Sequence, residues 1–362
     1  MRILRFLTAG ESHGPAMAAM LEGIPPGLKM DIDFINARLA LRQKGYGRGA
    51  RQAIEKDVVE ILAGVRKGVT TGAPLLLLVR NKDSRLDEAP EITVPRPGHA
   101  DLAGHMKYGI GIRDILERAS ARDTAARVAA GAVAELLLKR VGCTICGRVR
   151  AIGDVRANLP YPSSPKDFAG ADESPVRCPD KEATKRMTAA IDAAKAAGDS
   201  LGGIIDAAAF GVPAGLGSHV QWDRRVDAAI AQAIMSIPAI KGVEIGPAFE
   251  NAGLPGSKVH DEILPGSKGT YTRPTNRAGG IEGGITNGEP VVISAAMKPI
   301  PTLTQPLKSV DIATGKAVPA AQERSDVTAV PAASVVVEAM LALVLADLLM
   351  ECAGSDRLPD TR

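Results

Sequence analysis

Short glycine-marked segments recur in the same order in the two halves of the chain, and this repetition constrains the fold more than any other feature. Four pairs of segments share a pattern: Gly-x-Ser-x-Gly at 10–14 and 198–202, Gly-x-Pro-x-Gly at 23–27 and 211–215, Gly-x-Thr-x-Gly-x-Pro at 68–74 and 284–290, and Ala-Ala-x-x-Val-x-Glu at 129–135 and 332–338. This order predicts an internal duplication. We expect one domain over 1–362, with two similar α+β halves, roughly 1–150 and 190–352, packed on a shared core.

Apolar patterning and capping residues predict the elements of these halves. Strands are expected at 3–7, 16–21 and 75–79, and helices are expected after Asp31 and Asp180 and over 124–140. The polar, proline-rich stretch 156–180 is typical of a linker or a long surface loop. The longest apolar run, 335–350, is interrupted by two acids, so it predicts a buried core helix and not a membrane span.

The net charge and the cysteines argue against several classes of protein. The chain has 362 residues and a net charge of +3, which argues against wholesale nucleic-acid binding. Four cysteines and the lack of a secretory leader are typical of a protein of the reducing cytosol. Cys143 and Cys146 have the spacing of a metal or redox pair, but no second pair or nearby histidine completes a zinc site. We therefore interpret them as structural thiols.

The loop at 10–14 is the first candidate for chemistry. Its serine has a counterpart in the second half, Ser200, whereas His13 is replaced there by Leu201. Because a turn requires neither histidine nor leucine, His13 is interpreted as a chemical group. Histidine titrates near neutral pH and is a natural proton donor. Among the other histidines, His99 lies in an irregular Pro-Gly-His loop, and His105 is expected at a helix start.

A serine hydrolase is the main alternative, because Ser12 lies in a Gly-x-Ser-x-Gly segment that matches a nucleophile elbow. It would need a later histidine and acid, for which His260 and Asp261 are available. Against it, the elbow of an α/β-hydrolase follows several strands, whereas Ser12 follows only one.

Arginines form the second candidate feature. The segment 38–51 carries five basic residues and no acid: Arg38, Arg42, Lys44, Arg48 and Arg51. It is compatible with an RNA-binding patch, but its single aromatic residue gives little support for base stacking. Guanidinium groups pair well with phosphates and carboxylates, so a small polyanion fits better. Ser120, between Arg118 and Arg122, resembles a second phosphate cradle. Asp326 is interpreted as a helix cap or as a carboxylate that faces a cofactor.

These motifs together resemble those of chorismate synthases along nearly the whole chain. The motifs that carry the resemblance are Gly-Glu-Ser-His-Gly at 10–14, Gly-Tyr-Gly-Arg-Gly at 45–49, Arg-Pro-Gly-His-Ala-Asp at 96–101, Glu-Arg-Ala-Ser-Ala-Arg at 117–122, Gly-Val-Glu-Ile-Gly at 242–246, His-Asp-Glu at 260–262, Met-Lys-Pro-Ile at 297–300 and Arg-Ser-Asp at 324–326. Departures from the usual family sequence are Asp123, Thr328 and His105, none of which is an expected proton donor.

The resemblance implies a lyase that converts 5-enolpyruvylshikimate-3-phosphate to chorismate with reduced FMN. It implies His13, His99 and Asp326 as catalytic residues. Substrate-binding residues would be Ser12, Arg42, Arg48, Arg122 and Arg324. Flavin-binding residues would be Arg118, Ala119, Ser120, Asn251, Ala252, Gly283, Lys298, Pro299, Ile300, Pro301, Thr302 and Arg324.

The resemblance also implies a layered β-α-β sandwich, a cytoplasmic homotetramer, and neither a metal, a nucleic acid nor a membrane as partner. The sequence leaves open whether the protein reduces its own flavin with NADPH, held by Arg42 and Arg48, or depends on an outside reductase.

Overall fold

Two antiparallel sheets organise the chain. The computed structural model describes residues 3–49, 56–321, 326–354 and 356–359. The first sheet has the order β1-β2-β6-β3, with β1 Arg5–Ala9, β2 Ala16–Glu22, β6 Leu75–Arg80 and β3 Val59–Ala63. The second has the order β10-β15-β9-β7-β8, with β10 Ile240–Ile245, β15 Val291–Met297, β9 Gly203–Phe210, β7 Thr144–Ile152 and β8 Val155–Arg156. The predicted mixture of helices and strands is confirmed.

The remaining elements are helices and short hairpins. The helices are α1 Ile32–Gln43, α3 Asp101–Tyr108, α4 Ile112–Arg118, α5 Thr124–Lys139, α6 Lys181–Ala196, α7 Val226–Met235, α8 Ala248–Asn251, α9 Gly256–Val259 and α10 Val330–Ala353. Two-stranded hairpins are formed by β4 Val65–Arg66 with β5 Val69–Thr70, β11 Leu264–Pro265 with β12 Tyr271–Thr272, β13 Ile281–Glu282 with β14 Ile285–Thr286, and β16 Lys308–Asp311 with β17 Lys316–Pro319. Single 3₁₀ turns lie at Leu86–Glu88, Ala121–Asp123, Pro165–Phe168, Trp222–Arg224 and Ser267–Gly269.

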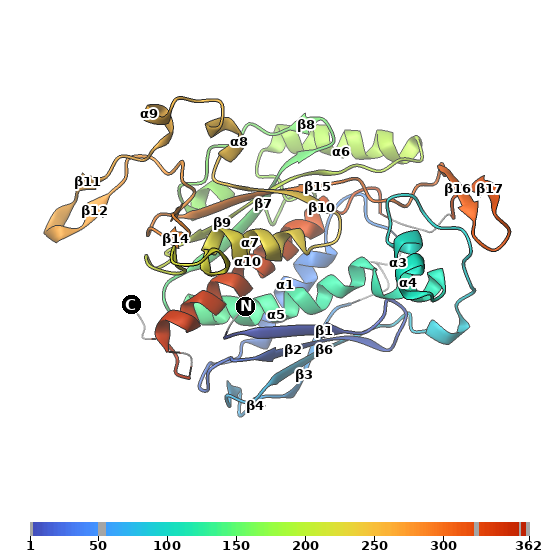
Figure 1. Ribbon diagram of the computed structural model, residues 1–362, viewed down its shortest axis with the longest axis horizontal. Coiled ribbons are helices and arrows are strands. Elements are labelled where there is room, and N and C mark those ends of the chain that lie inside the picture. Colours follow the sequence, from blue (N-terminus) through green and yellow to red (C-terminus); the bar gives the residue numbers. More distant parts are fainter. Residues whose placement is uncertain (1–2, 50–55, 322–325, 355, 360–362) are drawn as a thin grey trace.

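Helices α1, α5 and α10 lie between the two sheets (Figure 1). Helix α5 packs on β2 and β6, whereas α10 packs on α5 and also on β7 and β9. Gly131 of α5 allows this close approach, because a Cβ atom there would lie 2.4 Å from the Cβ of Ala339. Every residue of α10 from Val330 to Met350 is buried. The predicted core helix is therefore confirmed, and it begins five residues before the predicted run.

The third pair of repeated segments has the same local structure in both halves. Thr70 Oγ1 donates to Pro25 O (2.6 Å) and accepts from the amide of Leu28 (2.9 Å). Thr286 Oγ1 donates to Pro213 O (2.7 Å) and accepts from the amide of Leu216 (2.9 Å). Each threonine thus joins its short hairpin to the proline-containing turn of its own half.

Several predicted boundaries agree with the structure. Asp31 caps α1 by accepting from the amide of Phe34 (2.9 Å), and Asp180 caps α6 in the same way. Three predictions need correction. The first strand is 5–9, because residues 3 and 4 instead donate their amides to the carboxylate of Asp347 (2.8 Å each). His105 lies near the end of α3 and not at a helix start, with Nδ1 donating to Ile110 O. The stretch 156–180 is not only surface loop, because it buries Phe168 and Arg177.

Candidate active site

Asn81 fixes the loop at 10–14. Its Nδ2 lies 3.1 Å from Glu11 O, 3.3 Å from Ser12 O and 2.7 Å from Gly14 O. Gly10 has φ of +111°, and a Cβ there would lie 2.2 Å from a neighbouring carbonyl oxygen, so only glycine fits. The sequence thus builds a rigid turn that carries Ser12 and His13 on adjacent positions.

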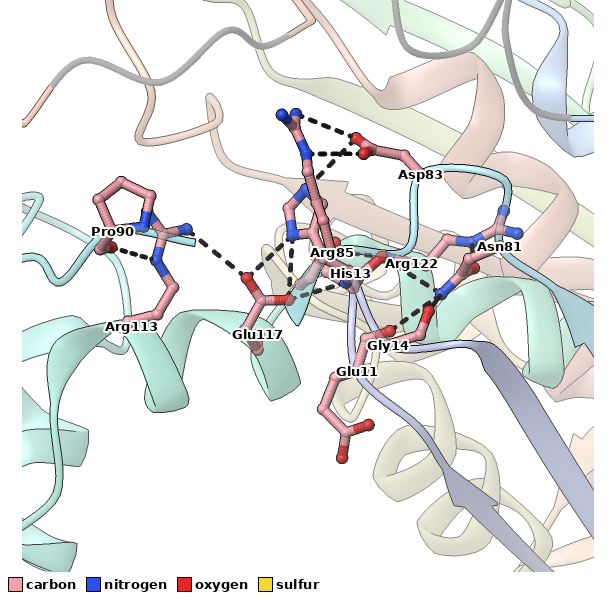
Figure 2. Close-up of polar contacts among 12 residues, drawn as sticks. Glu11, His13, Gly14, Asn81, Asp83, Arg85, Pro90, Arg113, Glu117 and Arg122 are labelled. Carbon is pink, nitrogen blue, oxygen red and sulfur yellow. Dashed lines mark hydrogen bonds and ion pairs between the residues drawn. The ribbon is translucent and has the colours of Figure 1, made fainter. Parts of the chain in front are cut away.

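His13 is held by a buried carboxylate (Figure 2). Its Nδ1 lies 2.9 Å and 3.0 Å from the two oxygens of Glu117, which also accepts the backbone amide of His13 (2.8 Å). Glu117 belongs to α4, and its side chain is 1% exposed. On the other side of the ring, Nε2 lies 3.7 Å from Asp83. The imidazole therefore sits between two carboxylates.

Two of the predicted substrate arginines, Arg42 and Arg122, meet at one carboxylate. Both oxygens of buried Asp57 accept from guanidinium groups, Oδ2 from Arg42 (2.5 Å) and Oδ1 from Arg122 (2.6 Å). Burial lowers the pKa of Arg42 despite Asp57, and the Arg48 and Arg122 charges lower it further. Burial also lowers the pKa of Arg48. The Nε atoms of Arg42 and Arg48 are buried without a hydrogen-bond partner. These guanidinium groups repel one another and have donors to spare, which suits an anionic ligand.

Asp326 joins this group. Its carboxylate accepts from Arg48 Nη1 (2.7 Å) and from the amide of Gly49 (2.6 Å). It does not cap the core helix, because α10 begins at Val330 with Ala329 as its N-cap. The helix-cap interpretation is therefore wrong. Two predicted basic residues, Arg51 and Arg324, lie outside the described residues.

His99 lies in a separate but neighbouring loop. Asp101 binds Arg96 through both oxygens (2.9 and 3.1 Å) and also accepts from His99 Nδ1. Burial opposes the charge on Asp101, but His99 and Arg96 hold the pKa of its carboxyl well below the ordinary range. Lys298, which follows β15, donates to Gly98 O (2.8 Å) and so connects this loop to the predicted flavin segment.

Hydrogen bonds link these loops at one end of the molecule. Ser120 Oγ donates to Ser12 Oγ (3.1 Å), and Arg122 Nε donates to Asn81 (2.7 Å). Ser200 Oγ donates to Ile300 O (2.7 Å), and the following residue, 201, bonds to the backbone of Val327. The structure therefore brings together the predicted residues around 12–13, 42–48, 118–122, 298–301 and 326.

The remaining predicted flavin residues lie elsewhere in the chain. Lys298 directly follows the last residue of β15, Met297. Asn251 instead donates to Arg277 O (3.0 Å), and the segment that contains Arg277 leads to the first residue of β15, Val291. Gly283 lies in the hairpin of β13 and β14, in that same region. Seven residues of extended strand span about 20 Å, and Figure 1 shows α8 and β14 well to the left of α3 and α4. Asn251, Ala252 and Gly283 thus do not join the site within one chain.

The hydrolase alternative is not assembled either. His260 and Asp261 line a cavity with Asn251, at that far end. Asp261 accepts from the hydroxyl of Thr275 and from the backbone amides of residues 277 and 278, so its carboxylate stabilises the backbone of that segment. The hydroxyl of Ser12 faces another serine. Arg38 belongs to the basic segment 38–51 in the sequence, but in the structure it binds Glu135 (3.0 Å) in the core.

Sequence reasoning missed four polar residues that hold the site: Asp57, Asn81, Asp83 and Glu117. Glu117 had a signal, because it opens a motif that was already singled out and lies between two arginines. The others lie in short polar stretches that match no motif, and the site residues that they bind come from other segments of the chain.

The sequence and the fold of this chain match those of one known protein family. The profile described as "Chorismate synthase" matches residues 4–350. The chorismate synthase of Brevibacillus brevis is 54% identical over 372 residues, covering 99% of this chain and 96% of that protein. The chorismate synthase of Pelobacter propionicus is 52% identical over 380 residues, covering 99% and 97%. A solved structure titled "Crystal Structure of Chorismate Synthase" has a TM-score of 0.82 and 46% identity, covering 99% of this chain and 94% of that one.

Proposed function

Because the chain belongs to the chorismate synthase family, we infer that it carries out the family's reaction with the residues gathered around Ser12, Asp57 and Asp326. It is a lyase of the shikimate pathway. The reaction eliminates phosphate and a ring proton from 5-enolpyruvylshikimate-3-phosphate to give chorismate. One observation carries the residue assignment: buried Arg42 and Arg122 and largely buried Arg48 share the carboxylates of Asp57 and Asp326. Asn81 connects Arg122 to the loop whose histidine is held between two carboxylates.

Arg42, Arg48 and Arg122 would bind the substrate's phosphate and carboxylates. Their guanidinium groups are already ordered by Asp57 and Asp326, so little side-chain entropy remains to be lost on binding. Ser12 would donate its hydroxyl hydrogen to the same anion. The network excludes water from the charged groups and strengthens each contact with the ligand.

His13 would donate a proton to the departing phosphate from Nε2. A carboxylate accepts hydrogen bonds only, so the contact with Glu117 assigns a hydrogen to Nδ1 and leaves Nε2 as the atom that exchanges protons. Nδ1 of His99 contacts the carboxylate of Asp101 and also lies 3.1 Å from Nη2 of Arg96, which can only donate. Asp101 is the closer partner and favours hydrogen on Nδ1, so Nε2 of His99 would hold the proton destined for the cofactor.

The residues at this end fit reduced FMN in part. Lys298, beside Gly98 and close to Lys241, offers a cation for an anionic group; burial, and then the Lys241 charge, lower the pKa of Lys298. When bound, the reduced flavin supplies electron density transiently, so that the carbon–oxygen bond breaks without net redox change. Asp326 would accept a proton at its carboxylate beside the cofactor. Arg42 and Arg48 would also serve NADPH in a protein that reduces its own flavin.

A second copy of the chain would supply Asn251, Ala252 and Gly283, which lie about 20 Å along β15 from Lys298. This supports the homotetramer that the resemblance implies. Mixing two inactive variants, His13→Ala and Asn251→Ala, should restore part of the activity if one site uses residues of two copies. No restoration, with both variants tetrameric, would contradict the shared site. A cytoplasmic location and an origin by duplication of two halves, as the matching bonds of Thr70 and Thr286 suggest, belong to the same proposal.

The function is tested by mixing the protein anaerobically with 5-enolpyruvylshikimate-3-phosphate and photoreduced FMN. Chorismate absorbance and free phosphate should rise together in equal amounts, and neither should appear with oxidised FMN. Phosphate release without chorismate would contradict the lyase. Ester hydrolysis that Ser12→Ala abolishes would instead favour the hydrolase.

A further inference from the structure

Glu117 makes more contacts with His13 than packing requires. It accepts from the ring through both oxygens (2.9 and 3.0 Å) and from the backbone amide of the same residue (2.8 Å). Figure 2 shows the carboxylate of Glu117 on the α4 side of the imidazole and Asp83 on the other. We propose that Glu117 is a positioning residue for the elimination, which fixes His13 with hydrogen on Nδ1 so that Nε2 faces the reacting anion. This inference rests on the proposed role of His13 as proton donor.

Glu117 is itself held in place. Its side chain is 1% exposed, and Arg113 Nη1, one helical turn earlier on α4, lies 3.6 Å from Oε1. Arg113 in turn donates from Nε to Pro90 O (2.9 Å). A buried carboxylate with fixed neighbours cannot rotate to follow the ring, so the ring follows the carboxylate.

The buried carboxylate of Glu117 needs several hydrogen-bond donors or cations around it. The ring and the backbone amide of His13, together with the guanidinium group of Arg113, supply them. On the far side of the ring, Asp83 lies 3.7 Å from Nε2 and is bound to Arg85 (2.8 Å). The positive charge of Arg85 weakens the attraction between Asp83 and the ring. Glu117 is thus the dominant partner at Nδ1, and Asp83 borders the atom that exchanges protons.

A Glu117→Gln substitution separates orientation from packing. Glutamine has nearly the same shape, but its amide can donate to Nδ1 and stabilise a neutral ring with hydrogen only on Nε2. That ring would have to become an imidazolate to give up its proton, so it is a much weaker acid than the imidazolium. In a carboxylate–histidine pair whose histidine acts first as a base, the corresponding substitution costs about 10⁴-fold in turnover. We expect kcat to fall by about a hundredfold or more, with KM for 5-enolpyruvylshikimate-3-phosphate changed by less than about threefold, because the arginines bind substrate independently.

The direct readout is the ¹⁵N spectrum of protein labelled in its five histidines, with His13 assigned by its loss in His13→Ala. Nδ1 of His13 should carry hydrogen in the wild type and lose it in Glu117→Gln. A neutral wild-type ring with a bare Nδ1 would overturn the proposal even if the variant fails to fold. Glu117→Asp keeps the charge and should recover at least about a tenth of the turnover. Glu22→Gln, at an exposed glutamate paired with Arg5, makes the same charge change on β2 and should behave as the wild type.

The two proposals fail in different ways. If Glu117 acts through His13, then His13→Ala and His13→Ala/Glu117→Gln should have equal turnover within about threefold. If His13→Ala turns over like the wild type, the proton-donor role of His13 is wrong. If His13→Ala is impaired but Glu117→Gln keeps the wild-type rate and spectrum, only the positioning role is wrong.

Discussion

Two buried arginine–carboxylate clusters lie in this molecule, and they differ in the sign of their excess charge. The site cluster contains Arg42, Arg48, Arg122, Asp57 and Asp326. The core cluster lies between α1, α5 and α10 and contains Arg38, Arg177, Glu135, Glu338 and Asp172. Among these described residues, the site cluster has three guanidinium groups and two carboxylates. The core cluster has two guanidinium groups and three carboxylates.

The core cluster can reach balance without a ligand. Burial raises the pKa of Glu135 to about 7, against the attraction of Arg38 and with further repulsion from Glu338. Burial opposes the charge on Glu338 too, but Arg177 and Arg38 lower its pKa. One proton on Glu135 therefore leaves two carboxylates for two guanidinium groups. This arrangement suits a cluster that holds helices together.

The site cluster has no such way to reach balance, because an arginine does not give up its proton in the physiological range. Its excess positive charge therefore fits the anionic substrate proposed for this site. On that proposal the sign of the excess charge, and not burial or the number of arginines, distinguishes the site cluster from the core cluster.

The largest expected effect is at Asp57. Asp57→Asn would leave Arg42, Arg48 and Arg122 facing one carboxylate, and removing one partner of a buried ion pair costs about 3–5 kcal/mol of unfolding free energy. Urea unfolding measures this loss, and inorganic phosphate should recover part of it. Asp172→Asn is the matched change in the core cluster. Since the side chain of Asp172 is 56% exposed, its loss should be much smaller. Equal losses of unfolding free energy in Asp57→Asn and Asp172→Asn would contradict the distinction between the two clusters.

The next effect separates binding from folding. Arg48→Ala should weaken substrate binding by about ten- to a hundredfold, since hydrogen bonds between charged groups contribute about 1.5–3 kcal/mol. Arg38→Ala should instead lower the unfolding free energy and leave affinity for the substrate within about threefold, because Arg38 binds Glu135 and Glu338. Calorimetric titration with substrate, in the absence of flavin, measures both affinities. An unchanged affinity in Arg48→Ala would remove it from the substrate site.

The partners of Arg38 and Arg42 in the two clusters could not be predicted from the sequence. The segment 38–51 is continuous and basic, so sequence reasoning treated Arg38 and Arg42 alike. Helix α1 places them one turn apart, yet Arg38 turns to Glu135 and Arg42 to Asp57. The acids that decide between these roles come from other elements, up to 300 residues away in the case of Glu338. No local pattern reports such a contact.

Local patterns succeeded where the cause is local. Asp31 and Asp180 cap the helices that follow them, because a side-chain oxygen next to free amides acts within three residues. The buried run of α10 could be predicted because it is apolar on nearly every face. His13 was found because its repeat counterpart is Leu201, but Glu117, which orients it, is 104 residues away.

The smallest expected effect is a pH dependence of stability from Glu135. Its pKa is about 7 in the folded protein against 4.5 ordinarily. The folded state therefore keeps a proton that the unfolded chain releases at lower pH. The resulting stabilisation is complete below about pH 4.5 and is lost as the pH rises through 7.

Glu135→Gln removes this titration, so the unfolding free energy of the wild type should fall relative to the variant between about pH 5 and pH 8. Urea unfolding at several pH values measures the difference. Glu22→Gln, at an exposed pair with Arg5, is the matched control and should give a constant difference from the wild type over the same range. A constant difference for Glu135→Gln as well would mean that the core cluster keeps all three carboxylates ionised. The balance that distinguishes it from the site cluster would then have to come from something other than a proton.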